Sequence, residues 1–452
     1  MEKLFKLKQN GTNVKTEIIA GITTFLAMAY ILAVNPNYLG GIADGPGRAA
    51  IFMATALSAA IATLCMAFFA NYPVALASGM GLNAFFAFTV CGAMGCSYKV
   101  ALTAILIEGI IFMILSLFKF REALVNKIPK NLKFGITAGI GLFITIIALL
   151  NAKVIVANPD TTVALGDISS PQVVLAIVGL LIIGVLHHYK VKGDILIGIL
   201  ATWVLGIVAE LIGWYQVNPD ADVYSLIPSL SWDSIKANFA APALFQFDFG
   251  YIAKNAMSFA VIVFTFLYTD IFDTVGTLIG VAQKGNLLDQ EGKLPNAGGA
   301  LMADAVGTVA GACLGTSTVT SYVESSAGVA AGGRTGLTAV TTAVMFLIAI
   351  LFAPVFLAIP GFATTPAMIF VGLLMLSAVK NMEFDGDVAD AIGGFLAIVM
   401  MPFAYSIATG IMFAIISWVV LKIFTGKIKD ISPIMWISVA LFVIYIITQI
   451  AA

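Results

Sequence analysis

Residues 315–328 read GTSTVTSYVESSAG and separate two apolar runs, 294–313 and 335–356, that are long enough to span a bilayer. The β-prone residues 317–321 predict a short extended piece, and Ser325 can start a half-helix. Glu324 is the one carboxylate of this segment. Irregular backbone at membrane depth survives only where protein buries it or where it lines a wet cavity. The stretch therefore predicts a polar site inside a membrane protein.

A second stretch of the same shape lies at residues 72–83, which read YPVALASGMGLN. An extended start with Pro73 is followed by small residues and then by Asn83, the one amide of this segment. Two interrupted membrane segments at corresponding places in two halves of a chain point to a binding site between them. We therefore expect a substrate site where the two half-helices approach each other.

The composition of the whole chain fits a membrane protein. Of its 452 residues, 60% are hydrophobic and only 10% are charged, whereas a soluble domain carries about 25% charged residues. The 23 basic and 24 acidic residues give a net charge of −1, which leaves no basic stripe for a polyanion. Soluble enzymes, disordered proteins and nucleic-acid binders are thereby excluded, and the lipid bilayer is the expected environment.

The apolar runs predict an all-α polytopic fold with about fourteen crossings. Candidate spans lie near 17–39, 48–70, 98–118, 133–150, 171–189, 194–214, 252–282, 294–313, 335–356, 404–423 and 433–450. The two interrupted segments, 72–90 and 316–331, add to these spans. Residues 366–401 contain two apolar runs around a polar patch, so the count could also be thirteen or fifteen.

Short internal matches suggest that the chain is a repeat of two halves with seven segments each. Thr24-Phe25-Leu26 recurs at residues 265–267, an offset of 241, and the same offset carries Asn83 onto Glu324. Residues 130–134 and 380–384 also resemble each other, at an offset of 250. An odd number of spans in each half would place the halves in opposite orientations, as in many secondary transporters.

The basic residues predict that both termini lie in the cytoplasm and that the protein resides in the cell membrane. They gather after the even-numbered spans, as Lys119, Arg121, Lys127, Lys130 and Lys133, then Lys190 and Lys192, Lys284 and Lys293, and Arg334. Lys422, Lys427 and Lys429 fit this orientation less well.

Ionisable residues inside the apolar spans are candidates for function, because a charge at mid-bilayer costs at least ~2.5–3.5 kcal/mol. Asp270 and Asp273 are the strongest, since their i, i+3 spacing places both carboxyls on one helix face. Two such groups in a dry place cannot both be ionised comfortably, so one should hold a proton, find a partner or face a polar cavity. Asp304 is expected to support a neighbouring half-helix, and Glu108 is open between a structural and a proton-conducting role.

Four stretches in this order, residues 18–36, 77–86, 270–280 and 318–333, resemble the AzgA-like adenine/guanine/hypoxanthine permeases, a branch of the nucleobase:cation symporters. The resemblance covers nearly the whole chain. It implies fourteen segments in two inverted repeats, with a core domain made of residues 1–120 and 245–360 and a gate domain made of residues 121–244 and 361–452. Related uracil and xanthine permeases carry a histidine one turn after the acid of the eighth segment, where this chain has Thr277.

The resemblance also implies a purine site between the third, eighth and tenth segments. It assigns substrate binding to Asn83, Asp270, Asp273 and Glu324, with Tyr322, Gly81, Ser325 and Thr277 as further candidates. Purines offer both N–H donors and ring-nitrogen acceptors, which suits carboxylates and an amide. We expect Glu324 to bind the purine, Asp270 or Asp273 to carry the proton, and no cofactor or metal to take part.

Three functions follow from these observations. The first is a proton-coupled purine importer with core-against-gate alternating access. The second is an anion transporter of the same fold, although a binding site for anions would need positively charged side chains, whereas this site would contain three acids. The third is a membrane enzyme that holds a metal–diphosphate with Asp270 and Asp273, although the chain lacks a second Asp-rich motif. A homodimer through the gate domain would agree with related folds.

Overall fold

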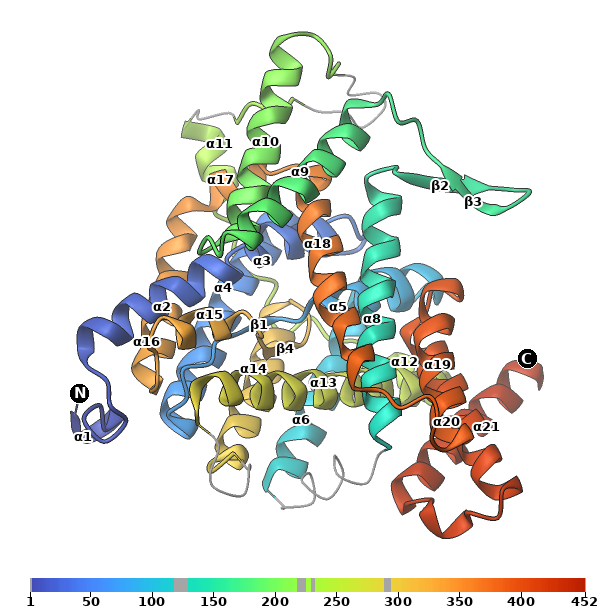
Figure 1. The fold of residues 1–452 in the computed structure, drawn as a ribbon. Coiled ribbons are helices and arrows are strands. Elements are labelled where there is room, and N and C mark those ends of the chain that lie inside the picture. The colour runs from blue at the N-terminus through green and yellow to red at the C-terminus, as the bar shows by residue number, and fades with distance from the viewer. Residues whose placement is uncertain (1, 118–128, 218–224, 229–231, 288–293, 452) are drawn as a thin grey trace.

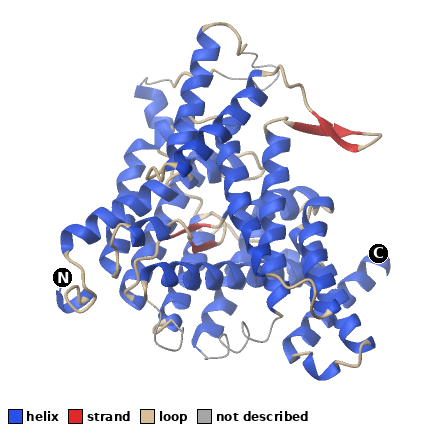
Figure 2. Cartoon of the chain, in the orientation of Figure 1, coloured by secondary structure: helices blue, strands red, loops and turns tan. Residues whose placement is uncertain are grey.

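The computed structural model describes residues 2–117, 129–217, 225–228, 232–287 and 294–451. Helices make up most of the molecule, and one small pair of strands lies at its centre (Figures 1 and 2). Among the described residues, eleven helices are long and apolar enough to cross a membrane, and three shorter apolar helices accompany them. The chain is thus an all-α polytopic membrane protein, while the number of fourteen crossings stays a prediction.

The elements of the first half are as follows: α1 (Glu2–Phe5), α2 (Val14–Met28), α3 (Ile31–Leu39), α4 (Arg48–Cys65), η1 (Met66–Ala70), β1 (Leu76–Ser78), α5 (Met80–Ala84), η2 (Phe85–Ala93), α6 (Tyr98–Leu117), α8 (Lys130–Asn151), β2 (Ile155–Asn158), β3 (Thr162–Leu165), α9 (Pro171–His188), α10 (Asp194–Leu211) and α11 (Trp232–Ala237).

The elements of the second half are α12 (Gly250–Lys254), α13 (Ala256–Gly285), α14 (Ala297–Leu314), β4 (Val319–Ser321), α15 (Ser325–Ala330), α16 (Gly336–Ala349), η4 (Ile350–Phe352), α17 (Ala353–Ala358), α18 (Gly361–Leu376), η5 (Ser377–Asn381), α19 (Val388–Phe403), α20 (Ile407–Phe424), η6 (Ile428–Asp430) and α21 (Pro433–Ala451).

The packing of these elements repeats itself in the two halves. Helices α2, α4 and α6 of the first half correspond to α13, α14 and α16 of the second. Accordingly, α4 packs against α16 and α14 packs against α6, while α2 packs against α16 and α13 packs against α6. Likewise α8 packs against α19 as α18 packs against α9, and both α9–α10 and α19–α20 are packed pairs. The strands β1 and β4 run antiparallel, as related strands of two oppositely oriented halves would. This pattern supports an internal repeat and leaves α21 as an additional helix beside α13 and α20.

The two sequence matches fit this repeat unequally. The strands correspond at an offset of 243 (319 − 76) and the half-helices at 245 (325 − 80), close to the predicted 241. Glu324 directly precedes α15, however, whereas Asn83 lies inside α5, so the two are not equivalent by position. The match at offset 250 aligns the start of α8 with η5 after α18. Those two stretches are instead neighbours, because Asn131 exchanges two hydrogen bonds with the backbone of Glu383.

Two spans that the sequence predicts as single helices are each divided into two helices, and the ambiguous residues 366–401 are assigned. The first span divides into α2 and α3 at Ala29 and Tyr30. The span predicted from 252 is interrupted at Asn255, between α12 and α13. Residues 366–401 form two separate helices, α18 and α19. The hairpin of β2 and β3, which projects from the helices in Figure 2, has no counterpart in the sequence-based expectations.

The lysines that fitted the orientation poorly are bound to the start of α19. Lys422 and Lys427 each place Nζ 2.7 Å from Oδ2 of Asp387, which also caps α19 by accepting a hydrogen bond from Ala389 N. The end of α20 therefore lies at the same end of the bundle as the start of α19. Lys119, Arg121, Lys127, Lys293 and the predicted domain boundary at 120/121 lie outside the described residues.

Candidate substrate-binding site

The centre of the site is the two-stranded ribbon that joins the two interrupted segments. Leu76, Ala77 and Ser78 pair with Ser321, Thr320 and Val319. Two further backbone bonds extend the pairing, from Gly79 N to Thr318 O and from Tyr322 N to Ala75 O, each 3.0 Å. The extended pieces predicted in both segments are thus confirmed (Figure 2). The ribbon thus supplies hydrogen-bond partners to backbone groups that lipid could not satisfy.

Glu324 follows the ribbon directly and is held by a tyrosine from the break in the first span. The hydroxyl of Tyr30 donates a 2.6 Å hydrogen bond to Glu324 Oε1. Tyr30 lies at the turn between α2 and α3, within the single span Val14–Leu39. Glu324 is partly exposed although it lies deep in the chain's apolar sequence, so one side of it faces open space.

Tyr322 and Asn83 are brought together by one backbone carbonyl. Tyr322 donates a 2.5 Å hydrogen bond to Ser78 O, and Nδ2 of Asn83 lies 3.4 Å from the same oxygen. Asn83 is fully buried, and its Oδ1 has no hydrogen-bond partner among the described residues. The rings of Tyr30 and Tyr322 lie 6.5 Å apart, so the amide and Glu324 border the same aromatic pair. An unused buried acceptor of this kind is suited to a ligand N–H.

The two aspartates of α13 occupy different surroundings. Asp273 is partly exposed, interacts electrostatically with Glu324 and lies within hydrogen-bonding reach of Thr320 on β4. Asp270 is fully buried and lies 3.4 Å from the hydroxyl of Thr274. Of the pair, Asp273 is therefore the more exposed.

A buried polar network behind the ribbon connects three elements. Thr274 Oγ1 of α13 lies 2.8 Å from Asp304 Oδ2 of α14 and 2.8 Å from Thr320 Oγ1 of β4. Ser321 donates a 3.3 Å hydrogen bond to the other oxygen of Asp304. The single proton of the Thr274 hydroxyl can serve only one carboxyl at a time, Asp270 or Asp304. Asp304 holds β4 in place, which agrees with the supporting role expected for it.

The remaining predicted residues have packing and backbone contacts. Ser325 Oγ accepts a 3.0 Å hydrogen bond from Ala75 N and so fixes the first segment against the second. A Cβ on Gly81 would lie 2.5 Å from Ile140 Cγ2, so this glycine lets α5 approach α8 closely. Thr277 is nearly buried, one turn beyond Asp273. Among the described residues no group of three or more His, Cys, Asp or Glu side chains could hold a metal ion.

Sequence reasoning missed Tyr30, Thr274, Thr320 and the carbonyl of Ser78. Tyr30 and Thr274 lie inside stretches with a strong family resemblance. Hydroxyl side chains are common in apolar spans, however, so their presence alone does not indicate a binding site. The contact of Tyr30 with Glu324 joins residues 294 positions apart.

A broken-helix bundle with a polar site at a central ribbon defines a membrane transporter rather than an enzyme. The chain matches the model of the Permease family over residues 15–413 and belongs to that family. It is 42% identical to the adenine permease AdeQ of Escherichia coli over 447 residues, covering 99% of this chain and 96% of that one. It is 41% identical to the guanine/hypoxanthine permease PbuG of Bacillus subtilis over 454 residues, covering 99% of both.

Solved structures show the same fold in more distant proteins. The transmembrane domain of a cyanobacterial bicarbonate transporter, BicA, matches with a TM-score of 0.65 at 16% identity, covering 88% of this chain and 97% of that one. The anion transporter SLC26A9 matches with a TM-score of 0.64 at 12% identity, covering 91% and 66%. At this identity the likeness concerns the fold alone. The relatives of high identity are permeases, so the chain is a transporter and the hypothesis of a metal–diphosphate enzyme is set aside.

Proposed function

We propose that the protein is a secondary active transporter that imports purine nucleobases by proton symport. The observation that carries the proposal is the set of hydrogen-bond acceptors around the ribbon, namely the unpartnered oxygen of Asn83 and the carboxyl groups of Asp273 and Glu324. A neutral purine supplies N–H groups to such acceptors, whereas an anion would be repelled by them. Relatives named for adenine and for guanine and hypoxanthine support this class of substrate without separating its members.

Glu324 is the residue proposed to bind the purine. Tyr30 holds one of its two oxygens, which orients the carboxyl while the partly exposed side remains available. Asn83 contributes the second anchor, because its amide offers a donor and an acceptor end. A flat heterocycle could lie against the Tyr30–Tyr322 pair, whose rings are separated by 6.5 Å.

Asp273 is the better candidate of the two aspartates for carrying the proton. It is partly exposed and lies close enough to Glu324 for the two charges to influence each other, and two carboxyls in a poorly hydrated site resist being charged together. A proton on Asp273 would thus allow Glu324 to be negative when the purine binds. Asp270 is fully buried and lies, like Asp304, within reach of the hydroxyl of Thr274.

Alternating access is proposed as a movement of the core domain against the gate domain. All the proposed binding groups belong to the predicted core, residues 1–120 and 245–360. The contact of Gly81 with Ile140 of α8 lies between the two predicted domains. This contact is apolar, so a relative movement of the two helices there breaks no polar interaction between these two residues.

The test is purine uptake by the purified protein in liposomes. Hypoxanthine, guanine and adenine should accumulate when a proton gradient is imposed, and an uncoupler should abolish accumulation. Replacing sodium by choline should have no effect. Uptake of bicarbonate or sulfate without purine uptake would instead establish the alternative anion transporter.

Variants of the acids separate binding from coupling. Asp273→Asn should still bind hypoxanthine but no longer concentrate it, whereas Glu324→Gln should bind it weakly at any pH. Asp304→Asn serves as the comparison, since it should lower the amount of folded protein more than it alters affinity. Full uncoupler-sensitive accumulation by both Asp273→Asn and Asp270→Asn would reject the aspartates as proton carriers and leave Glu324 or Glu108.

A further inference from the structure

A cavity of about 750 Å³ lies apart from the ribbon, between the first half of the chain and α18. Its size falls within the range of pockets that hold small molecules, about 300–1,000 Å³. Its wall combines polar side chains and aromatic faces from α3, α4, η2, the end of α8 and α18, namely Asn37, Tyr38, Arg48, Phe88, Asn151 and Thr364. None of these residues belongs to the substrate site at the ribbon.

Arg48 is held in a fixed position at the cavity wall. Its Nη2 donates hydrogen bonds to Asn37 Oδ1 and to the backbone carbonyl of Ile359. Gly40 makes room for its stem, because a Cβ on Gly40 would collide with Arg48 Cγ. Both hydrogen bonds leave from one nitrogen, and a guanidinium carries five N–H donors in a planar fork. The other edge of the fork is therefore oriented without being used by these two bonds.

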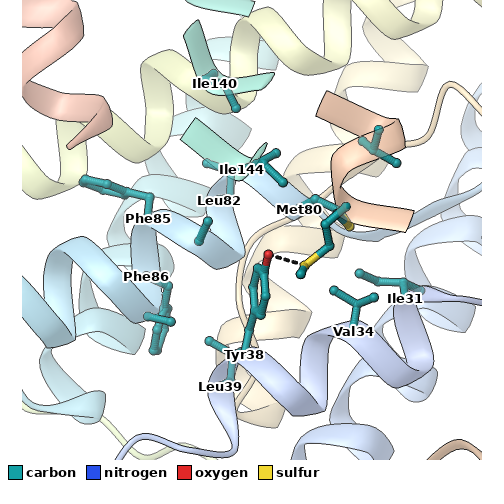
Figure 3. Packing of buried hydrophobic residues seen from close by; sticks show 14 of the residues in the cluster. Ile31, Val34, Tyr38, Leu39, Met80, Leu82, Phe85, Phe86, Ile140 and Ile144 are labelled. Carbon is teal, nitrogen blue, oxygen red and sulfur yellow. Dashed lines mark hydrogen bonds between the residues drawn. The ribbon is translucent and has the colours of Figure 1, made fainter. Parts of the chain in front are cut away.

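Two residues of the cavity wall, Tyr38 and Met368, contact each other across the boundary between the predicted core and gate domains. The hydroxyl of Tyr38 on α3 donates to the sulfur of Met368 on α18, the dashed line in Figure 3. Helix α3, which carries Tyr38, packs against α5, whose first residue is Met80. Asn83 of the substrate site follows one turn later on that helix. One helix, α5, therefore connects the neighbourhood of the cavity wall with the proposed site.

We propose that this cavity is a waiting site on the outer access path, in which Arg48 recognises an oxopurine before Tyr38 and Met368 part to admit it. The inference deepens the proposed function and rests on it. In the predicted orientation, with the N-terminus inside, the end of α3 and the start of α4 face outward.

The chemistry of the wall favours hypoxanthine and guanine over adenine. The 6-oxo group and N7 of an oxopurine are two adjacent acceptors, and an arginine fork donates to both at once. Adenine presents an amino donor at the same position, which faces the fork with the wrong polarity. Phe88 and Tyr38, whose rings are 5.2 Å apart and steeply inclined, provide an apolar face for the ring.

The test uses a reporter thiol at the cavity mouth. Ala43 is exposed and lines the cavity, so Ala43→Cys is made in a protein whose native cysteines, Cys65, Cys91, Cys96 and Cys313, are replaced by serine. A membrane-impermeant maleimide is applied to the outside of intact cells. Hypoxanthine should slow labelling, and adenine should need a concentration roughly tenfold higher for the same effect.

Three variants separate the waiting site from closure of the inner site and from a purely structural role of Arg48. Protection should persist when Asn83→Ala removes an anchor of the inner site, because the cavity is separate from it. Arg48→Ala should abolish protection, and Arg48→Lys, which keeps the charge but not the fork, should remove the preference for hypoxanthine. Size-exclusion profiles establish that each variant is folded.

Some results would overturn the inference while leaving purine transport intact. Loss of protection in Asn83→Ala would mean that labelling only reports closure of the inner site. Protection by sulfate or bicarbonate in place of hypoxanthine would make Arg48 an anion site. Full protection in Arg48→Ala would remove it from recognition. Wild-type hypoxanthine uptake, measured in the same cells, tests the proposed function separately.

Discussion

Glu17 is the buried carboxylate whose removal should weaken the scaffold most clearly. Its Oε1 accepts a 2.9 Å hydrogen bond from Arg334 N, and its Oε2 accepts four, from the backbone N–H and hydroxyl groups of Thr335 and Thr338 at 2.7–3.2 Å. These donors form the start of α16, where helix N–H groups have no partner within the helix. Glu17 of α2 thus caps a helix more than 300 residues away.

The change Glu17→Gln replaces one accepting oxygen by an NH₂ group that can only donate. The hydrogen bond from Arg334 is lost and becomes a donor–donor contact, and the other bonds lose their charge assistance. Hydrogen bonds to charged groups contribute about 1.5–3 kcal/mol each, so the free energy of unfolding should fall by roughly 2–4 kcal/mol. With an unfolding entropy of about 2.1 cal/mol/K per residue, the midpoint should drop by roughly 2–4 °C.

Thermal unfolding of the detergent-solubilised protein, followed by intrinsic fluorescence, measures this shift. Asp160→Asn is the matched control, because Asp160 is exposed in the turn between β2 and β3 and its replacement should leave the midpoint unchanged. Glu17→Ala should lower the midpoint further than Glu17→Gln. A midpoint for Glu17→Gln within the error of the control variant would refute the capping argument.

Three further changes test other contacts. Tyr30→Phe removes the hydrogen bond to Glu324 and should weaken hypoxanthine binding roughly tenfold, for about 1.4 kcal/mol, in a filter-binding assay; unchanged affinity would show that the hydroxyl is dispensable. Gly81→Val should slow uptake while binding persists, because its side chain would press into α8; a normal uptake rate would refute the close contact. The bonded ammonium of Lys422 lowers the pKa of Asp387 far below its usual range, so the stabilisation is complete above the unfolded pKa near 4 and is lost gradually as the pH falls toward the folded pKa; Asp387→Asn should lower the unfolding midpoint at pH 7 and somewhat less at pH 3, and a larger loss at pH 3 would contradict this.

The position of the site could be predicted from the sequence because lipid leaves so few options for polar backbone. The stretches around Asn83 and Glu324 are short, rich in small residues and flanked by spans, which is the pattern of interrupted helices. Extended pieces followed by half-helices are what the structure shows at both places. Their pairing as one ribbon depends on contacts between residues more than 240 positions apart, which local pattern does not encode.

Contacts that depend on helix ends were beyond sequence reasoning. Glu17 appeared only as the first residue of a span, although it is buried and accepts five hydrogen bonds. Lys422 looked like an orientation signal, whereas it pairs with Asp387 across an antiparallel hairpin. In both cases the partner is the start of a distant helix. The exact ends of helices decide such contacts, and they are the least predictable feature of a sequence pattern.

The distribution of polar contacts suggests why such a site could move as one piece. Tyr30, Asn83, Asp273 and Glu324 come from four segments, yet the ribbon and the hydrogen bonds around it tie them together within the predicted core. The contact of Gly81 with α8, toward the predicted gate, is apolar by contrast. Breaking an apolar contact in one place and remaking it in another exposes no unpaired buried polar group, whereas pulling apart the ribbon would cost about 1–3 kcal/mol for each one left unsatisfied. We infer that the core domain moves relative to the gate domain along apolar contacts during the transport cycle. The hydrogen bonds of the polar site stay intact during this movement.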